Sequence, residues 1–97
     1  MNDQNSEDIR LAKSGDRDAL DRVLNRSRDR FAEMASRAIG PALRQKVNTS
    51  DIVQSTYLQV IRDITTFEGQ DDDAFESWVR RIVENTVRQK HRFFTAK

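Results

Sequence analysis

The chain has 97 residues, of which 34% are charged, and a net charge of only +1; the length fits one domain with a modest core. There is no cysteine and one histidine, His91, which excludes disulfides, thiolate chemistry and the usual Cys or His metal sites. No apolar run reaches the roughly 18 residues of a membrane span, and Gly, Pro and β-branched runs are few. We therefore expect an all-α, cytoplasmic protein without membrane contact.

The N-terminal residues predict a short helix after a polar segment. Residues 1–5 are polar, and we expect them to be disordered. Ser6 can cap the helix, with Glu7 and Asp8 in the first turn, where carboxylates favour the helix dipole. Gly15 then ends it. The residues expected to face the core are Ile9, Ala12 and Leu11.

The longest amphipathic pattern spans about residues 17–39, with Asp16 as its N-cap and Gly40-Pro41 as its end. Its mixed-sign charges at helical spacing are typical of a solvated face with i,i+4 pairs. Residues 41–46 fit a turn or a short helical extension anchored by Leu43. The predicted buried stripe consists of Leu20, Val23, Leu24, Ser27, Phe31, Met34, Ala35, Ala38 and Ile39.

A third helix is predicted from Asn48 or Thr49, either of which can cap it, to about Thr65. Its predicted buried stripe is Val53, Tyr57, Val60, Ile61 and Ile64. A second face consists of Asp51, Gln54, Ser55, Leu58 and Arg62. An apolar Leu58 among polar groups suits a protein partner, or packs on a neighbouring helix.

Residues 67–73 form the main predicted loop, in which Gly69 allows a turn and Asp72 or Asp73 caps the next helix. Consecutive Asp residues at 71–73 lack the spacing of a calcium loop, so we expect a solvated loop and cap, with no metal and no cofactor. Aromatic residues cluster around this loop, either in the core or with one exposed to stack on an unpaired base. They are Phe67, Phe75 and Trp78.

The last predicted helix covers about residues 74–92 and is basic. From residue 76 to the end there are six Lys or Arg against two Glu, a charge of +4, so the rest of the chain carries −3. The predicted buried stripe is Phe75, Trp78, Val79, Ile82, Val83 and Val87. The polar face is Arg81, Asn85, Arg88, Gln89 and Arg92.

This polar face has two interpretations. Guanidinium groups can bind phosphates, and interleaved amides can pair with base edges. Alternatively, the face is solvated and its cations favour the C-terminal end of the helix dipole. No Gly-rich phosphate loop and no nucleophile with a histidine base occur, so we predict a non-enzyme without catalytic residues.

Five blocks of sequence resemble, in order, region two of bacterial sigma factors. Residues 51–58 (DIVQSTYL) resemble the D-[LIV]-V-Q-[ED]-T-[FYL]-L signature of the extracytoplasmic-function (ECF) group. Residues 13–20 (KSGDRDAL), 67–70 (FEGQ) and 75–85 (FESWVRRIVEN) resemble further blocks of that group. Residues 43–51 (LRQKVNTSD) are similar to the segment that runs into this signature in a planctomycete-like subgroup.

The resemblance implies a compact bundle of about four helices and a role in transcription initiation. Region two binds the clamp helices of the RNA polymerase core, and it recognises and melts the promoter minus-ten element, holding a base flipped from the non-template strand. The implied polymerase-binding residues are Asp51, Gln54, Ser55, Leu58 and Arg62. The implied DNA-binding residues are Glu68, Gly69, Gln70, Asp71, Arg80, Arg81, Asn85, Arg88, Gln89 and Arg92, with Trp78 as support beneath them.

The sequence departs from the family pattern at Ser55, where an acidic residue is usual, and at Glu68, where a basic one is common. With Asp71 to Asp73, Glu68 makes the expected base pocket acidic. We expect a single region-two domain over residues 1–97, without the second domain that reads the minus-thirty-five element. The alternatives are a sigma-like decoy or anti-sigma-bound module that binds no promoter, and a purely structural bundle.

Overall fold

The computed structural model describes the backbone of residues 4–95 and the side chains of residues 4–92. Of the segment expected to be disordered, residues 1–5, the first three residues lie outside this range. The helices are α1 (Gln4–Lys13), α2 (Arg17–Ala38), α3 (Pro41–Arg44), α4 (Thr49–Asp63), the 3-10 helix η1 (Ile64–Thr66) and α5 (Asp72–Thr95). Strands are absent from the described residues. The predicted all-α fold with four main helices is confirmed.

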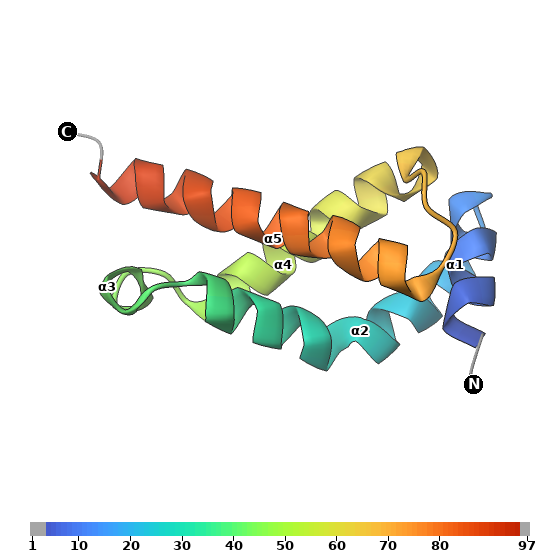
Figure 1. The fold of residues 1–97 in the computed structure, drawn as a ribbon, viewed down its shortest axis with the longest axis horizontal. Coiled ribbons are helices and arrows are strands. Elements are labelled where there is room, and N and C mark those ends of the chain that lie inside the picture. The colour runs from blue at the N-terminus through green and yellow to red at the C-terminus, as the bar shows by residue number, and fades with distance from the viewer. Residues whose placement is uncertain (1–3, 96–97) are drawn as a thin grey trace.

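Three long helices form the body of the molecule, which measures 44 × 25 × 19 Å. α2, α4 and α5 all pack against one another, and α1 packs on α2, α5 and η1. In Figure 1, α1 closes one end of the bundle, while α3 lies at the other end. The loop between η1 and α5 therefore runs beside α1, at the closed end.

Two of the predicted helix starts are confirmed by their side-chain caps. The Asp16 carboxylate accepts a hydrogen bond from the backbone N–H of Ala19 at 3.0 Å, and Gly15 before it has a positive φ of 107°. The Asn48 side chain accepts from the N–H of Ser50 at 3.1 Å. These local signals were readable because each cap lies within three residues of its partner.

Two other predicted caps are wrong. α1 already includes Gln4 and Asn5, so residues 4–5 are helical and Ser6 lies inside the helix. The Ser6 hydroxyl instead accepts from the backbone N–H of Asp72, at 3.1 Å. α5 begins at Asp72, two residues earlier than predicted, and its cap is Asp71, which accepts from the N–H of Ala74 at 2.8 Å.

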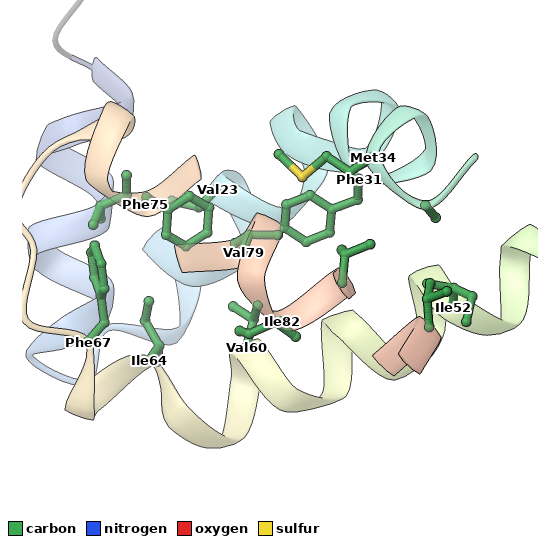
Figure 2. Packing of buried hydrophobic residues seen from close by; sticks show 14 of the residues in the cluster. Val23, Phe31, Met34, Ile52, Val60, Ile64, Phe67, Phe75, Val79 and Ile82 are labelled. Atoms are coloured by element: carbon green, nitrogen blue, oxygen red, sulfur yellow. The ribbon is translucent and has the colours of Figure 1, made fainter. Parts of the chain in front are cut away.

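The core runs the length of the bundle between α2, α4 and α5 (Figure 2). The predicted stripe of α2 is confirmed: Val23, Phe31, Met34, Ala35 and Ile39 are buried, Leu20, Leu24 and Ala38 pack against them, and Ser27 is buried in the gap. On α5, Phe75, Val79, Ile82, Val83 and Val87 are buried, and Trp78 is partly buried.

The predicted stripe of α4 is confirmed in part: Val60 and Ile64 are buried, and Val53 and Tyr57 pack against the core. Ile61 is 46% exposed, whereas Ile52 and Thr56 are fully buried with Val60. The Thr56 hydroxyl donates to the carbonyl of Ile52 at 2.8 Å, which satisfies it inside the core. The prediction included Ile61 and left out Ile52 and Thr56, so the predicted stripe lies to one side of the buried one.

The aromatic side chains near the loop belong to the core, as one of the two interpretations had it. Phe67 and Phe75 are buried, with ring centroids 6.0 Å apart in an edge-to-face arrangement, and Figure 2 shows them at the end of the core nearest α1. Phe31 of α2 joins them, 6.4 Å from Phe75. This cluster fixes the two ends of the loop.

The predicted solvated face of α2 is confirmed for most of its charges, which are exposed, but three arginines also make tertiary contacts. Asp8 of α1 is fully buried and accepts hydrogen bonds from Arg22, at 3.0 Å, and from Arg26. These two guanidinium groups lower the pKa of Asp8 well below its ordinary value, against the opposing effect of burial. Among the described residues of α2, the i,i+4 ion pair is Glu33–Arg37.

Arg30 makes a second bridge, from α2 to the start of α5. Its guanidinium contacts Asp72 at 3.2 Å and Glu76 at 2.7 Å. The pKa of Glu76 is lowered mainly by this hydrogen bond and further by Arg80. Neither bridge could be predicted from local sequence patterns, because the partners are far apart in the chain.

Candidate functional site

A hollow of about 390 Å³ opens between the loop and the first turns of α5. It is lined by Thr66, Phe67, Glu68, Gly69, Ala74, Ser77, Trp78 and Arg81. Three of the predicted DNA-binding residues, Glu68, Gly69 and Arg81, therefore meet at one place. Trp78, predicted as their support, lies with them.

The wall of this hollow is aromatic. The rings of Phe67 and Trp78 are stacked, with centroids 4.9 Å apart and planes 29° apart. Phe67 is buried, and Trp78 keeps part of its surface exposed. A flat ring surface next to an exposed Arg81 suits a planar, electron-rich group with a phosphate nearby.

Gly69 lets the loop pass close to the helix. A Cβ at this position would lie 2.5 Å from Cζ of Phe67 and 2.6 Å from Cβ of Ala74. Both distances are far below ordinary contact, so only glycine fits here without a shift of the loop. The carbonyl of Gly69 accepts a hydrogen bond from the Lys13 ammonium at 2.6 Å.

The acidic residues of the loop are mostly committed to structure. Asp71 caps α5, and Asp72 pairs with Arg30 and accepts from Asn5. Glu68 is the acidic residue among those that line the hollow. Gln70 and Asp71 are exposed but are not among the lining residues. The hollow is thus less acidic than the sequence suggested.

The polar face predicted on α5 is exposed. Arg81, Asn85, Arg88, Gln89 and Arg92 are all exposed, and helical spacing places them along one side. Arg88 donates to the Asn85 side-chain oxygen at 2.8 Å. Arg80 lies on a different side, where it donates to Glu76 at 3.0 Å. The structure therefore separates Arg80 from the other predicted DNA-binding residues.

The second predicted face, on α4, is also accessible. Asp51, Gln54, Leu58 and Arg62 are exposed and Ser55 is half-buried; Leu58 is 61% exposed. Arg62 contacts its neighbour Asp63 at 2.9 Å and lowers the pKa of that carboxyl. The exposed Ile61, which the sequence reasoning missed, adds a second apolar side chain to this surface.

A mainly apolar groove of about 590 Å³ lies between α2 and α4, next to this face. It is lined by Arg28, Ala32, Asn48, Thr49, Ser50, Val53, Gln54 and Tyr57. Arg28 and Ala32 come from α2, and their approach to α4 could not be read from the sequence.

Neither a metal centre nor a membrane span is found in the part of the chain that the structure describes. Its His, Asp and Glu side chains form no group of three or more that could hold a metal ion. None of its helices is both long and apolar enough to cross a bilayer.

The family model for sigma-70 region 2 matches residues 23–93, which is well over half of the sequence. The fold is a bundle of helices with two exposed polar faces, and the chain belongs to the sigma-70 region 2 family. Region 2 in general binds the RNA polymerase core and recognises the promoter minus-ten element, and it is not an enzyme. Comparison with curated proteins and with solved structures gave no match.

Proposed function

We propose that this chain acts as the region-two part of an ECF-group sigma factor of the planctomycete-like subgroup, in the cytoplasm. In this proposal the α4 face binds the clamp helices of polymerase, and the hollow with the α5 face reads the single-stranded non-template strand of the minus-ten element. The observation that carries it is the hollow between Trp78 and the loop, continuous with Arg81.

The hollow suits an unpaired base for three reasons. Its volume of about 390 Å³ lies at the lower end of the range for small-ligand sites. Its stacked aromatic wall offers the contact that recovers the cost of unstacking a base, a few kcal/mol. Arg88 and Arg92, farther along α5, provide charges for the backbone of the same strand.

The α4 face suits a protein partner. Leu58 and Ile61 form a small apolar centre with polar Asp51 and Gln54 around it, the arrangement typical of interface hot spots. Gln54 also lines the apolar groove against α2. A helix of the polymerase clamp can lie along α4 and place a side chain in that groove.

The polymerase face is tested by the double variant Asp51→Ala with Gln54→Ala. We expect it to bind the isolated clamp-helix fragment at least about tenfold more weakly than wild type, because it removes two polar contacts at the interface. Calorimetry or a quantitative pull-down measures the affinity. The control is Asp18→Ala with Gln45→Ala, which replaces the same residue types at exposed sites outside this face. If both double variants bind the clamp-helix fragment equally well, the α4 face is not the polymerase-binding surface.

The DNA face is tested by Arg88→Ala. We expect weaker binding of fluorescent single-stranded DNA and a log–log salt slope smaller by about 0.7, since one phosphate contact is lost. Fluorescence anisotropy across a salt series measures both quantities. Arg37→Ala is the control, because it removes the same charge from an exposed site on α2. A slope lowered equally by both variants means that only net charge matters.

The second candidate is a sigma-like module that occupies polymerase, or is held by an anti-sigma factor, without reading a promoter. Glu68 at the edge of the hollow favours it, because a carboxylate there repels the phosphates of an incoming strand. This candidate predicts clamp-helix binding together with no detectable binding of single-stranded DNA.

A further inference from the structure

We propose that α1 holds the loop at residues 67–71 in the shape that receives a base, with Lys13 as the principal positioning residue. This inference rests on the proposed function of the hollow. α1 precedes the residues matched by the family model, which begin at residue 23. The contacts between α1 and the loop are therefore observed in this structure and lie outside the family match.

Lys13 reaches across from α1 to the middle of the loop. Its ammonium donates to the Gly69 carbonyl at 2.6 Å and lies 5.4 Å from the centre of the Phe67 ring. Phe67 is the ring on which Trp78 stacks. One partly buried cation therefore fixes both the loop backbone and the aromatic wall, and a charged donor makes a stronger hydrogen bond than a neutral one.

Asn5 and Ser6 fix the other end of the loop. The Ser6 hydroxyl accepts from the N–H of Asp72, one of the N–H groups at the start of α5, and Asn5 donates to the Asp72 carboxylate. Arg30 holds the same carboxylate from α2. Lys13 thus holds the loop at Gly69 and this pair holds it at Asp72, and residues 70–71 span the interval.

α1 itself is anchored away from the loop. Asp8 is held by Arg22 and Arg26, and Arg26 also donates to the Asn5 side-chain oxygen at 3.1 Å. Ile9 and Ala12 are buried in the core. Because α1 is fixed to α2 by separate contacts, its loop contacts can be removed without detaching the helix.

The test uses Trp78, the one tryptophan of the chain, as an internal probe of the hollow. In Lys13→Met, we expect the acrylamide quenching constant of Trp78 to rise about twofold, because the loop opens more often. Far-UV circular dichroism should stay unchanged. Lys13→Arg, which keeps a cationic donor, should restore the wild-type value. Lys46→Met, at an exposed site away from the loop, should leave it unchanged.

Ser6→Ala provides a second, smaller change at the other end of the loop, and it keeps the test valid if Lys13→Met folds poorly. We expect quenching to rise in the same direction. Unchanged quenching in the folded variants, or a failure of Lys13→Arg to restore the value, overturns the positioning role whatever the DNA results are.

The link to base recognition is measured with a library of randomised 12-nucleotide single strands. Wild type should enrich a preferred sequence, and Lys13→Met should lose about tenfold in that preference while keeping the salt slope supplied by α5. Raised quenching with unchanged preference overturns the link to recognition. No binding by wild type overturns the proposed DNA function instead, and quenching alone then decides whether α1 holds the loop.

Discussion

Replacing Asp8 by alanine is expected to lower the midpoint of thermal unfolding by roughly 10 °C. Asp8 is fully buried between α1 and α2, and it accepts hydrogen bonds from both Arg22 and Arg26. Its removal leaves the two guanidinium groups without their shared partner and weakens the contact between α1 and α2. Circular dichroism at the helix band, followed during heating, measures the midpoint.

The same variant tests how the contribution of Asp8 to the stability of the fold depends on pH. The arginines lower the pKa of Asp8 below its ordinary value of 3.8, so its contribution to stability is complete above about pH 5. The contribution is lost as the pH falls below the ordinary value toward the pKa of the folded state. The difference between wild type and Asp8→Ala should therefore be constant from about pH 7 to 5 and shrink in more acidic solution.

The control for Asp8 is Asp21→Ala, which removes a carboxylate from an exposed position on α2. It should change stability by less than about 0.5 kcal/mol. A midpoint that falls equally in both variants would mean that overall charge, rather than the buried carboxylate, determines the loss.

Local signals in the sequence predicted most of the fold. The caps at Asp16 and Asn48 and the buried stripe of α2 follow from residues within one or two helical turns, so they needed no knowledge of the tertiary structure. Asp8 shows where such reasoning stops. Its place in the first turn of a short helix indicated only a carboxylate that favours the helix dipole, and its burial depends on two arginines that follow it by 14 and 18 residues.

The candidate site likewise contains some residues that the sequence could indicate and others that depend on distant partners. The family resemblance and helical spacing together indicated Gly69, Arg81 and Arg88, and the structure places the first two in one hollow and the third on the exposed face of α5. Lys13 begins the resembling block at residues 13–20, but the resemblance implied no role for it, and its partner Gly69 lies 56 residues away. The resemblance also implied Arg80, but one residue of helix turns a side chain by about 100°, and Arg80 donates to Glu76.

Gly69→Ala is expected to abolish the sequence preference for single-stranded DNA while leaving clamp-helix binding unchanged. The added methyl group would overlap the Phe67 ring, 2.5 Å away, and the Ala74 side chain, 2.6 Å away. Such overpacking costs about 1–3 kcal/mol and is relieved by moving the loop outward. Because the loop forms one wall of the hollow, the affinity for the preferred strand should fall about tenfold or more.

Gly40→Ala is the matched control, because a Cβ at Gly40 meets nothing within 4 Å and its backbone is extended, with φ −74° and ψ 166°. It should leave both activities unchanged. Anisotropy with the preferred strand and calorimetry with the clamp-helix fragment measure the two activities separately. If Gly69→Ala weakens both equally, the domain has unfolded; if it weakens neither, the hollow does not bind the base. A loss confined to DNA binding assigns recognition to the loop and polymerase binding to α4, two surfaces that can then be altered independently.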